Sequence, residues 1–221
     1  MFDGTPSALQ AELSDALLRR PRAGRAACRL AGGCGHWSIP VDSWQPPPDL
    51  LDFLNGEVPI YAGFGSPSAV LRRKALTKLS NALAAAAWCS CQAGAALIAR
   101  CCRRTFFIAR DVPHEWLFPR VSLAIHNGGA GTAHAAARAG VPQVILPFGV
   151  NQFFWASRVA ARGAAPRFSG WGAAAIAKMI AFAPLDSTRR NAQELGQAMA
   201  REDGVGTAVS SRQLWIADAE M

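Results

Sequence analysis

The stretch VSLAIHNGGAGTAHAAARAGVPQVILP, residues 121–147, decides the fold. Its apolar beginning predicts a buried β-strand, which runs directly into a cluster of glycines at 128–131. An alanine-rich helix follows and ends at Gly140 and Pro142, because glycine caps helix C-termini and proline cannot continue a helix. A second strand is predicted over 143–148. This order of strand, glycine turn, helix and strand predicts two parallel strands joined by a helix.

The same alternation continues on both sides of this stretch. Further strands are predicted at 58–64, 95–99 and 105–109, and further helices at 69–87, 152–162, 172–182, 186–200 and 206–216. The sequence therefore predicts an α/β fold, a Rossmann-like parallel sheet with flanking helices. Three consecutive prolines at 46–48 predict an extended linker, because they fit neither a helix interior nor a central strand. We accordingly expect a poorly defined N-terminal extension over 1–41 and one domain over 42–218.

The composition indicates a folded protein with a basic surface. Apolar residues make up 51% of the chain and charged residues 17%, which excludes a disordered polypeptide. The net charge of +8 suits a phosphorylated ligand, an anionic membrane or nucleic acid, and equally a solvated arginine-rich surface. No groove-reading motif accompanies the charge, so nucleic acid is not an expected partner.

The cysteines and the chain start bear on metal binding and location. Six cysteines show no C-x-x-C spacing, so we expect reduced thiols and no metal site. The N-terminus places acids before arginines and has no apolar core, unlike a secretory signal, which favours a cytoplasmic location. The alanine-rich stretch 82–99 has the length of a membrane span, but polar residues interrupt it. A buried helix followed by a strand explains it as well, so we expect at most peripheral membrane contact.

The glycine cluster has the chemistry of an anion site. Glycines allow the backbone to approach a phosphate closely, and the first N–H groups of the following helix point toward it at the positive end of the helix dipole. A glycine turn that serves only packing has the same spacing, so spacing alone leaves both interpretations open.

A longer segment carries a family resemblance. Residues 112–163, VPHEWLFPRVSLAIHNGGAGTAHAAARAGVPQVILPFGVNQFFWASRVAARG, resemble the signature region of family 1 GT-B UDP-glycosyltransferases. WQPPP at 44–48 and YAGFGS at 61–66 resemble the beginning of this domain in the sterol glucosyltransferase and antibiotic glycosyltransferase subgroup. The resemblance covers about residues 42–218 and is weak over 86–106. It implies the C-terminal, donor-binding half of such an enzyme, with a UDP-sugar as donor substrate and no separate cofactor.

The resemblance also implies which residues meet the donor. It places the strand turn and the helix start at the diphosphate, the segment 112–114 at the edge of the uracil, and the pair 151–152 at the sugar hydroxyls. The donor-binding residues implied in this way are Ser66, Val112, Pro113, His114, His126, Asn127, Gly128, Gly129, Ala130, Gly131, Thr132, Asn151 and Gln152. None of them is expected to be the catalytic base.

Several of these residues have plainer interpretations. His114 is equally explained as an ordinary loop histidine. The nearby aromatic residues Trp116, Phe118 and Trp155 fit a protein core as well as a ligand pocket.

Two positions depart from the family pattern. The family has a histidine directly before the glycine pair, in contact with the diphosphate, whereas here Asn127 holds that place and His126 stands one residue earlier. Neighbouring side chains on a strand point to opposite faces, so His126 does not simply substitute. Asn127 donates a hydrogen bond but offers no positive charge to a departing diphosphate. Asn151 replaces a sugar-binding aspartate, an acceptor-only carboxylate.

The family's reaction is an inverting displacement in which a base in the N-terminal domain deprotonates the acceptor hydroxyl. Residues 1–40 are too short for such a domain. We therefore expect a donor-binding half, a truncated product or a docking subunit, that is inactive alone and transfers a hexose to a lipid, sterol or other small-molecule hydroxyl only with an acceptor half. The departures at 127 and 151 favour the alternative of a non-catalytic nucleotide-sugar-binding or scaffold protein.

Overall fold

The computed structural model describes residues 44–55, 58–64, 88–91, 106–109, 112–207 and 209–210. The chain divides into two compact units. Val41–Gly196 forms one unit and contains the sheet, while Met1–Pro40 and Gln197–Met221 form the other. The expected limits of the extension, 1–41, and of the domain, 42–218, stay predictions.

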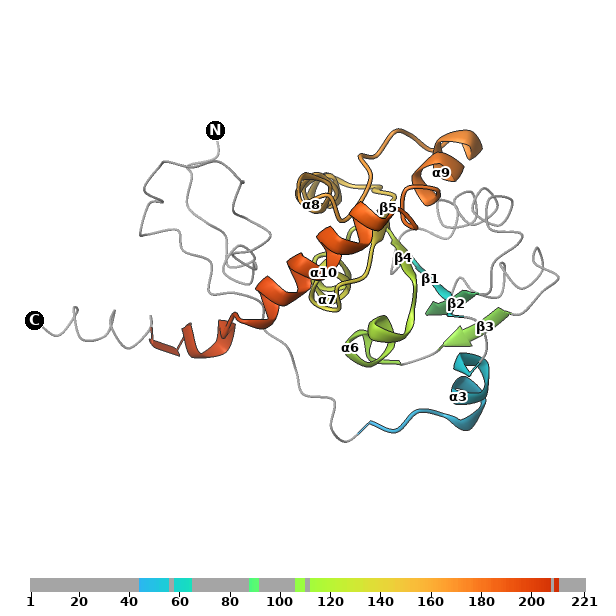
Figure 1. Ribbon diagram of the computed structural model, residues 1–221, viewed down its shortest axis with the longest axis vertical. Helices are drawn as coiled ribbons and strands as arrows, with labels where there is room; N and C mark the ends of the chain where they lie inside the picture. Colours follow the sequence, from blue (N-terminus) through green and yellow to red (C-terminus); the bar gives the residue numbers. More distant parts are fainter. Residues whose placement is uncertain are drawn as a thin grey trace, which may run out of the picture. The chain divides into compact units, whose positions relative to one another are not determined.

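In the part of the chain that the structure describes, five parallel strands form the sheet (Figure 1). In chain order they are β1 (Ile60–Gly63), β2 (Trp88–Cys91), β3 (Phe106–Ala109), β4 (Leu123–His126) and β5 (Gln143–Ile145). Their order across the sheet is β3-β2-β1-β4-β5, and every neighbouring pair is parallel. The α/β fold with a parallel sheet is therefore confirmed. β1 lies in the centre, where Ile60 pairs with Trp88 on one side and with Leu123 on the other.

The helices follow the strands in the expected alternation. They are α3 (Pro48–Leu54), α6 (His114–Leu117), α7 (Ala130–Arg138), α8 (Val150–Ala161), α9 (Ala173–Ile180) and α10 (Asp186–Ala200), with a 3-10 helix, η1, at Phe118–Arg120. The last three begin and end within two residues of their predicted limits. The predicted helix 69–87 and strand 95–99 lie outside the described residues, and so does most of 206–216.

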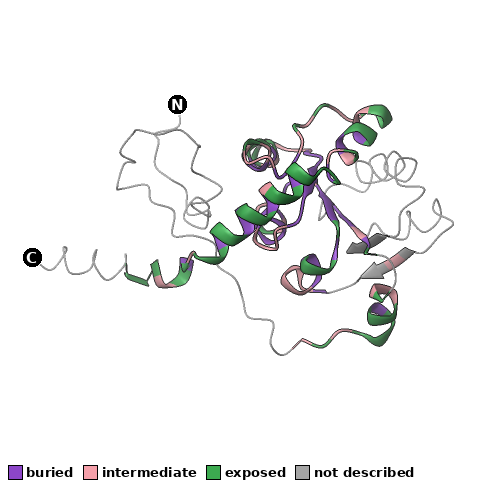
Figure 2. Cartoon of the chain, in the orientation of Figure 1, coloured by how far each residue is buried: buried purple, intermediate pink, exposed green. Residues whose placement is uncertain are grey.

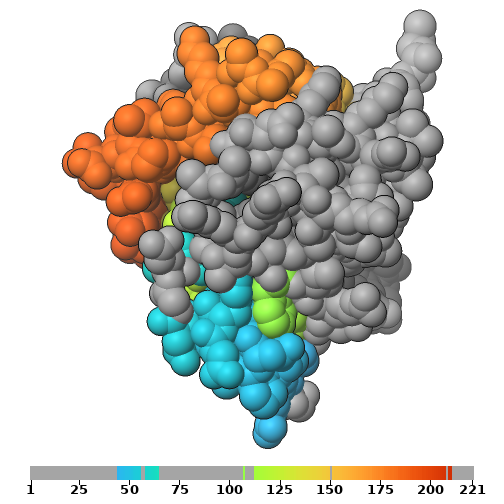
Figure 3. Space-filling model, turned by 90° about the vertical axis from the view of Figure 1, so that its right-hand side faces the viewer, coloured from blue at the N-terminus to red at the C-terminus, as the bar shows by residue number. Residues whose placement is uncertain are grey.

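Helix α3 shortens the extended linker predicted through the prolines, since Pro47 keeps an extended backbone with φ −59° and ψ 143° and the helix begins at Pro48. Pro48 lies in the first turn, where a helix needs no N–H donor and the fixed φ of proline suits the helical backbone. Leu50 is fully buried, and the ring of Phe53 packs 5.4 Å from that of Phe107 in β3. Figure 3 shows the blue and cyan atoms of α3 at the surface of the unit.

Strand β2 corrects a second prediction. Trp88–Cys91 lies inside the alanine-rich stretch 82–99, where the sequence places a helix before a later strand. These residues instead pair with both β1 and β3. Within the described part of the chain, no helix combines the length and apolar character needed to cross a membrane.

Both faces of the central strands are buried, as Figure 2 shows by the purple colour of β4 and β5. On one face Leu123 and Ile125 of β4 pack with Ile176 of α9. On the other face Ala124 packs with residues of α3, α6 and α7. Burial on two faces explains why the strand reads as a continuous apolar run without alternation. It also fixes the ends of β1, β4 and β5 firmly enough to carry a site.

Candidate functional site

The order of the strands places a candidate site at the C-terminal ends of β1 and β4. From β1 the chain adds β2 and β3 on one side and then crosses back to add β4 and β5 on the other. Open parallel sheets bind ligands where the strand order reverses in this way, beyond the carboxyl ends of the strands. Phe64 follows β1 here and Asn127 follows β4. Ser66, the expected diphosphate contact on the β1 side, lies outside the described residues.

The glycine turn, residues 127–129, joins β4 to α7. Gly128 has a φ of 87°, a left-handed conformation that favours glycine. Gly129 is the N-cap of α7 with a φ of −59°, and apart from its chain neighbours no described residue has an atom within 4 Å of the place a Cβ would take there. The N–H groups of 130–132 have no intrahelical acceptor, and no other described residue accepts from them. Three main-chain donors at this helix start therefore have no acceptor in the part of the chain that the structure describes, which is the arrangement of an anion site.

His126 lies beneath this turn and is fully buried. Its Nδ1 accepts a hydrogen bond from the N–H of Gly128 at 3.0 Å, so its Nε2 carries the proton and donates to Oε1 of Gln143 at 2.9 Å. Burial lowers the pKa of His126 to about 4, against the opposing effect of the Gln143 hydrogen bond and with a smaller lowering by His114. The ring is thus neutral with both nitrogens engaged. His126 lies under the turn with both ring nitrogens bonded to protein groups, and its expected contact with the donor stays a prediction.

Asn127 directly follows β4, and the alternation of side chains along a strand predicts that it points to the side opposite His126. Asn127 is half-buried, and its side-chain amide has no hydrogen-bond partner among the residues that the structure describes. The contrast with His126 follows the alternation of neighbouring side chains that the sequence predicts. Asn127 is therefore the polar side chain at the end of β4 that is left for a ligand.

Helix α8 begins beside the glycine turn. The Oε1 atom of Gln152 accepts hydrogen bonds from the N–H groups of Phe148 and Gly149, at 2.6 and 3.1 Å. Because both partners are donors, the accepting atom is the amide oxygen. This bond pair caps the helix and leaves the Nε2 group of Gln152 with no partner in the described part of the chain. Asn151, next to it, is exposed. The pair therefore offers amide donors to a ligand.

An aromatic group lies under the segment expected at the uracil. Nε2 of His114 is 3.1 Å from the hydroxyl of Tyr61, and its ring stacks on Phe118 with 4.7 Å between centroids. Burial lowers the pKa of His114, while Glu115 opposes the change, so the ring is neutral. Phe118 is fully buried, which agrees with its interpretation as a core residue. The His114 side chain likewise serves packing.

The main chain of residues 112–114 differs from the His114 side chain, because some of its polar groups have no partner in the described part of the chain. The carbonyl of Pro113 accepts hydrogen bonds from the N–H groups of Trp116 and Leu117 and so begins α6. The N–H and C=O of Val112 have no partner among the described residues. Of the three residues expected at the base, Val112 keeps both main-chain groups for a base edge, and the N–H of His114, at the first position of α6, also has no acceptor among the described residues.

The two tryptophans also pack against protein. Trp155 is 3% exposed, and its ring meets the edge of His134 in α7, 4.7 Å between centroids. Trp116 lies 4.9 Å from Trp44, and the guanidinium of Arg120 lies 4.0 Å from its ring centre. These contacts support the core interpretation of both residues.

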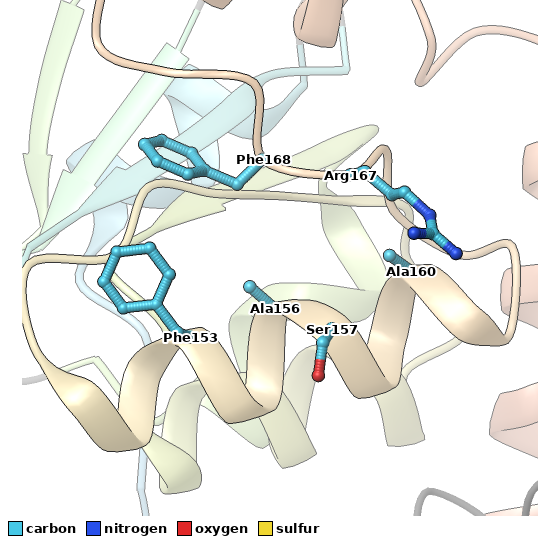
Figure 4. A pocket seen from close by; sticks show the side chains of 6 residues that line it. All are labelled: Phe153, Ala156, Ser157, Ala160, Arg167 and Phe168. Atoms are coloured by element: carbon cyan, nitrogen blue, oxygen red, sulfur yellow. The ribbon is translucent and has the colours of Figure 1, made fainter.

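A cavity of about 370 Å3 lies along α8, apart from the glycine turn. Its lining residues are Phe153, Ala156, Ser157, Ala160, Arg167 and Phe168. Figure 4 shows the two phenylalanine rings at one end and Arg167 toward the other. None of the expected donor-binding residues lines it. Among the described residues, no group of three or more His, Cys, Asp or Glu is placed to hold a metal ion.

Residues 104–209, which include the glycine turn and α8, match the family described as erythromycin biosynthesis protein CIII-like, C-terminal domain. The chain carries the C-terminal domain of a family 1 GT-B glycosyltransferase. The sequence resemblance is thereby confirmed.

Relatives of this glycosyltransferase domain include plant and bacterial enzymes. A sterol 3-beta-glucosyltransferase of Arabidopsis thaliana is 33% identical over 183 residues, which are 77% of this chain and 28% of the relative. An O-mycaminosyltylonolide 6-deoxyallosyltransferase of Streptomyces fradiae is 31% identical over 220 residues, 91% of this chain and 48% of the relative. An anthocyanidin 3-O-glucosyltransferase solved with UDP shares the fold, with a TM-score of 0.61 at 15% identity over 79% of this chain and 44% of that one. The chain spans less than half the length of each.

Two residues of the glycosyltransferase domain that lie next to the site were assigned no role from the sequence alone. Gln143 is fully buried at the start of β5 and bonds to His126. A buried polar residue inside an apolar run is unusual, and this was the available signal. Tyr61 is buried within β1, and its hydroxyl fills the space beside Gly63, at the end of the strand, and leaves no room for a side chain there.

Proposed function

We propose that this glycosyltransferase domain binds a UDP-sugar. The diphosphate lies at the start of α7, the uracil at the main chain of Val112, and the hexose near Asn151 and Gln152. The sugar is transferred to a hydroxyl of a lipid, sterol or other small molecule once an acceptor-binding domain, in the same protein or in a separate subunit, completes the site. The part of this domain is to hold the donor and to stabilise the departing UDP electrostatically.

The observation that carries this proposal is the set of main-chain donors at the start of α7. The N–H groups of 130–132 have no acceptor among the described residues, and they lie at the point where the strand order reverses. Asn127 and the Nε2 group of Gln152 add side-chain amides without a partner among the described residues. No carboxylate belongs to this set, so nothing in it repels a diphosphate.

A matched set of glycine variants tests the site. Gly129→Asp adds a negative charge where the phosphate approaches, and it does so without backbone strain because φ is negative and the space is open. Gly129→Ala adds the Cβ alone. Gly172→Asp is the control, because Gly172 is the N-cap of α9 with similar backbone angles and open space. Thermal unfolding with and without millimolar UDP is the measurement.

UDP should raise the unfolding temperature of the parent and of Gly172→Asp. Gly129→Asp should lose the shift and should still unfold cooperatively without ligand. Absence of a shift in the folded parent would overturn the proposed site. An equal shift in Gly129→Asp would place the nucleotide elsewhere.

A non-catalytic binding role is the second candidate, and Asn127 favours it. A neutral amide stands where the family has an imidazole, so the leaving diphosphate meets no side-chain positive charge at this position. Hydrolysis and transfer from a UDP-hexose, with the chain fused to the acceptor domain of a related enzyme, separate the two. Transfer above the level of the acceptor domain alone supports catalysis; binding without transfer supports the second role.

A further inference from the structure

We infer that a buried chain of hydrogen bonds holds the glycine turn in the shape that meets a diphosphate, with His126 as the positioning residue. We call this chain the turn brace; its members are Gly128, His126, Gln143 and Ala133. The inference rests on the proposed function, since it concerns how that ligand is held.

The brace runs through three hydrogen bonds. The Gly128 N–H donates to Nδ1 of His126, Nε2–H of His126 donates to Oε1 of Gln143, and Nε2 of Gln143 donates to the carbonyl of Ala133 at 3.3 Å. It therefore links the end of β4, the turn, the start of β5 and the first turns of α7. Both side chains in the chain are fully buried, so water does not compete for these bonds.

The directions of these bonds follow from the groups themselves. A main-chain N–H only donates and a carbonyl only accepts, so the Gly128 end and the Ala133 end fix every proton between them. His126 must be the Nε2–H tautomer, and Gln143 must turn its oxygen toward it. Protonation of His126 or a flip of Gln143 would leave a buried donor facing a donor, which costs more than the lost bond.

The brace decides which main-chain groups are left for a ligand. Gly128 turns its N–H inward to His126, so this group is not available to a phosphate. The ligand is left with the donors of 130–132, whose direction depends on where α7 begins. Loss of the bond between the Gly128 N–H and His126 frees the turn next to these donors. Loss of the bond between His126 and Gln143 instead alters the core beneath the turn.

Two variants of His126 separate these bonds. The Oδ1 atom of asparagine takes the place of Nδ1, so His126→Asn keeps an acceptor for the Gly128 N–H and loses the bond to Gln143. The amide of glutamine takes the place of Nε2, so His126→Gln keeps a partner for Gln143 and loses the acceptor for Gly128. Each variant lacks one buried bond, and both should lose stability.

Affinities for UDP and for uridine, measured by titration calorimetry or NMR, supply the readout. His126→Gln should bind UDP about tenfold more weakly than the parent, which is the scale of one lost hydrogen bond. His126→Asn should stay within about threefold. Uridine lacks the diphosphate, so its affinity should be unchanged in both. Thr188→Ala removes the hydrogen bond that the buried Thr188 hydroxyl of α10 donates to the carbonyl of Phe182, and it serves as a destabilised control with parental UDP affinity.

Equal UDP affinities in the two His126 variants would overturn the inference. Loss of uridine binding in parallel with UDP would also overturn it, because it would show general damage to the core. Ring 15N shifts of His126 without ligand test the brace separately, and an Nδ1–H tautomer would contradict it even if UDP binds. A parent that shows the Nε2–H tautomer but binds no UDP would overturn the proposed function and the ligand part of the inference together.

Discussion

The main-chain oxygen of Gln152 lies 3.0 Å from the point where a Cβ on Gly128 would stand. The glycine turn and the start of α8 therefore approach too closely for any side chain between them. In the proposed function this contact joins the diphosphate part of the site to the sugar part. Gly128 is thus required for two independent reasons, its left-handed φ of 87° and this close approach.

Gly128→Ala should lower the free energy of unfolding by about 1–3 kcal/mol, because strain of the backbone adds to contacts with Gln152 and with the Ile145 methyl group at 2.8 Å. Gly131→Ala is the matched control. Its Cβ meets open space inside a helix, so it should raise stability by up to about 1 kcal/mol. Urea unfolding of both variants without ligand is the measurement. If Gly128→Ala left the free energy of unfolding unchanged, the turn would be able to relax without cost.

Asn127→His, in a fusion with an acceptor domain of a related enzyme, should raise turnover by about ten- to a thousandfold and change UDP affinity less. An imidazole at this place can meet the charge that develops on the leaving diphosphate, and one such donor is worth about 3 kcal/mol in a preorganised site. Asn127→Ala should lower turnover below the parent. If both variants match the parent in steady-state kinetics, the side chain at 127 does not reach the diphosphate.

His126 should make stability depend on pH in a defined window. Its pKa in the folded chain is about 4, below the ordinary value of 6.5, so the unfolded state binds the proton first as pH falls. The contribution of neutral His126 to the free energy of unfolding is fully present above about pH 6.5. It declines between pH 6.5 and 4 and is lost below pH 4. The expected loss is about 3 kcal/mol.

Denaturant unfolding of the parent and of His126→Asn across this range isolates the effect. The carboxylates and the other three histidines titrate in both proteins, so the part of the difference between the two curves that depends on pH belongs to His126. This difference should narrow as the pH falls from 6.5 to 4. Parallel curves would contradict the buried, neutral state of the ring.

Gln152→Glu should keep the cap of α8 and change the sugar site. A carboxylate accepts from the N–H groups of Phe148 and Gly149 as the amide oxygen does, so stability should stay near that of the parent. The donor at Nε2 is lost, so the ratio of UDP-glucose affinity to UDP affinity should fall. Gln152→Leu leaves both N–H groups without this acceptor and should cost about 1–3 kcal/mol of stability. Equal stability of the two variants would show that the cap contributes nothing.

The parallel sheet and the helices α8 to α10 could be predicted because their signals are local. An apolar run bounded by glycine or proline marks a strand buried on two faces, and helix ends carry their own residues. Helix α3 was missed because a run of prolines usually excludes a helix, while a proline in the first turn does not. Strand β2 was missed because Trp88–Cys91 shows no boundary of its own in an alanine-rich stretch.

Part of the candidate site could likewise be predicted from the sequence, and part could not. The glycine turn follows from a local pattern, and so does the opposite orientation of His126 and Asn127. The turn brace does not follow from a local pattern, because it depends on the register of β4 and β5. Gln143 pairs with Ala124, two residues before His126, and this register places both polar side chains on one face. No spacing within a single segment of sequence contains that information.

The central position of β1 has a consequence for synthesis of the chain. Ile60 pairs with Trp88 and with Leu123, which are made 28 and 63 residues later. At roughly 5–20 residues per second, the ribosome needs about 3 to 13 seconds after β1 to reach β4. Parallel pairing offers no hairpin to shorten this interval, because each neighbouring strand comes after a long crossover. Until β4 is complete, one edge of β1 is open to strands of other chains, so aggregation threatens this domain most while it is being translated.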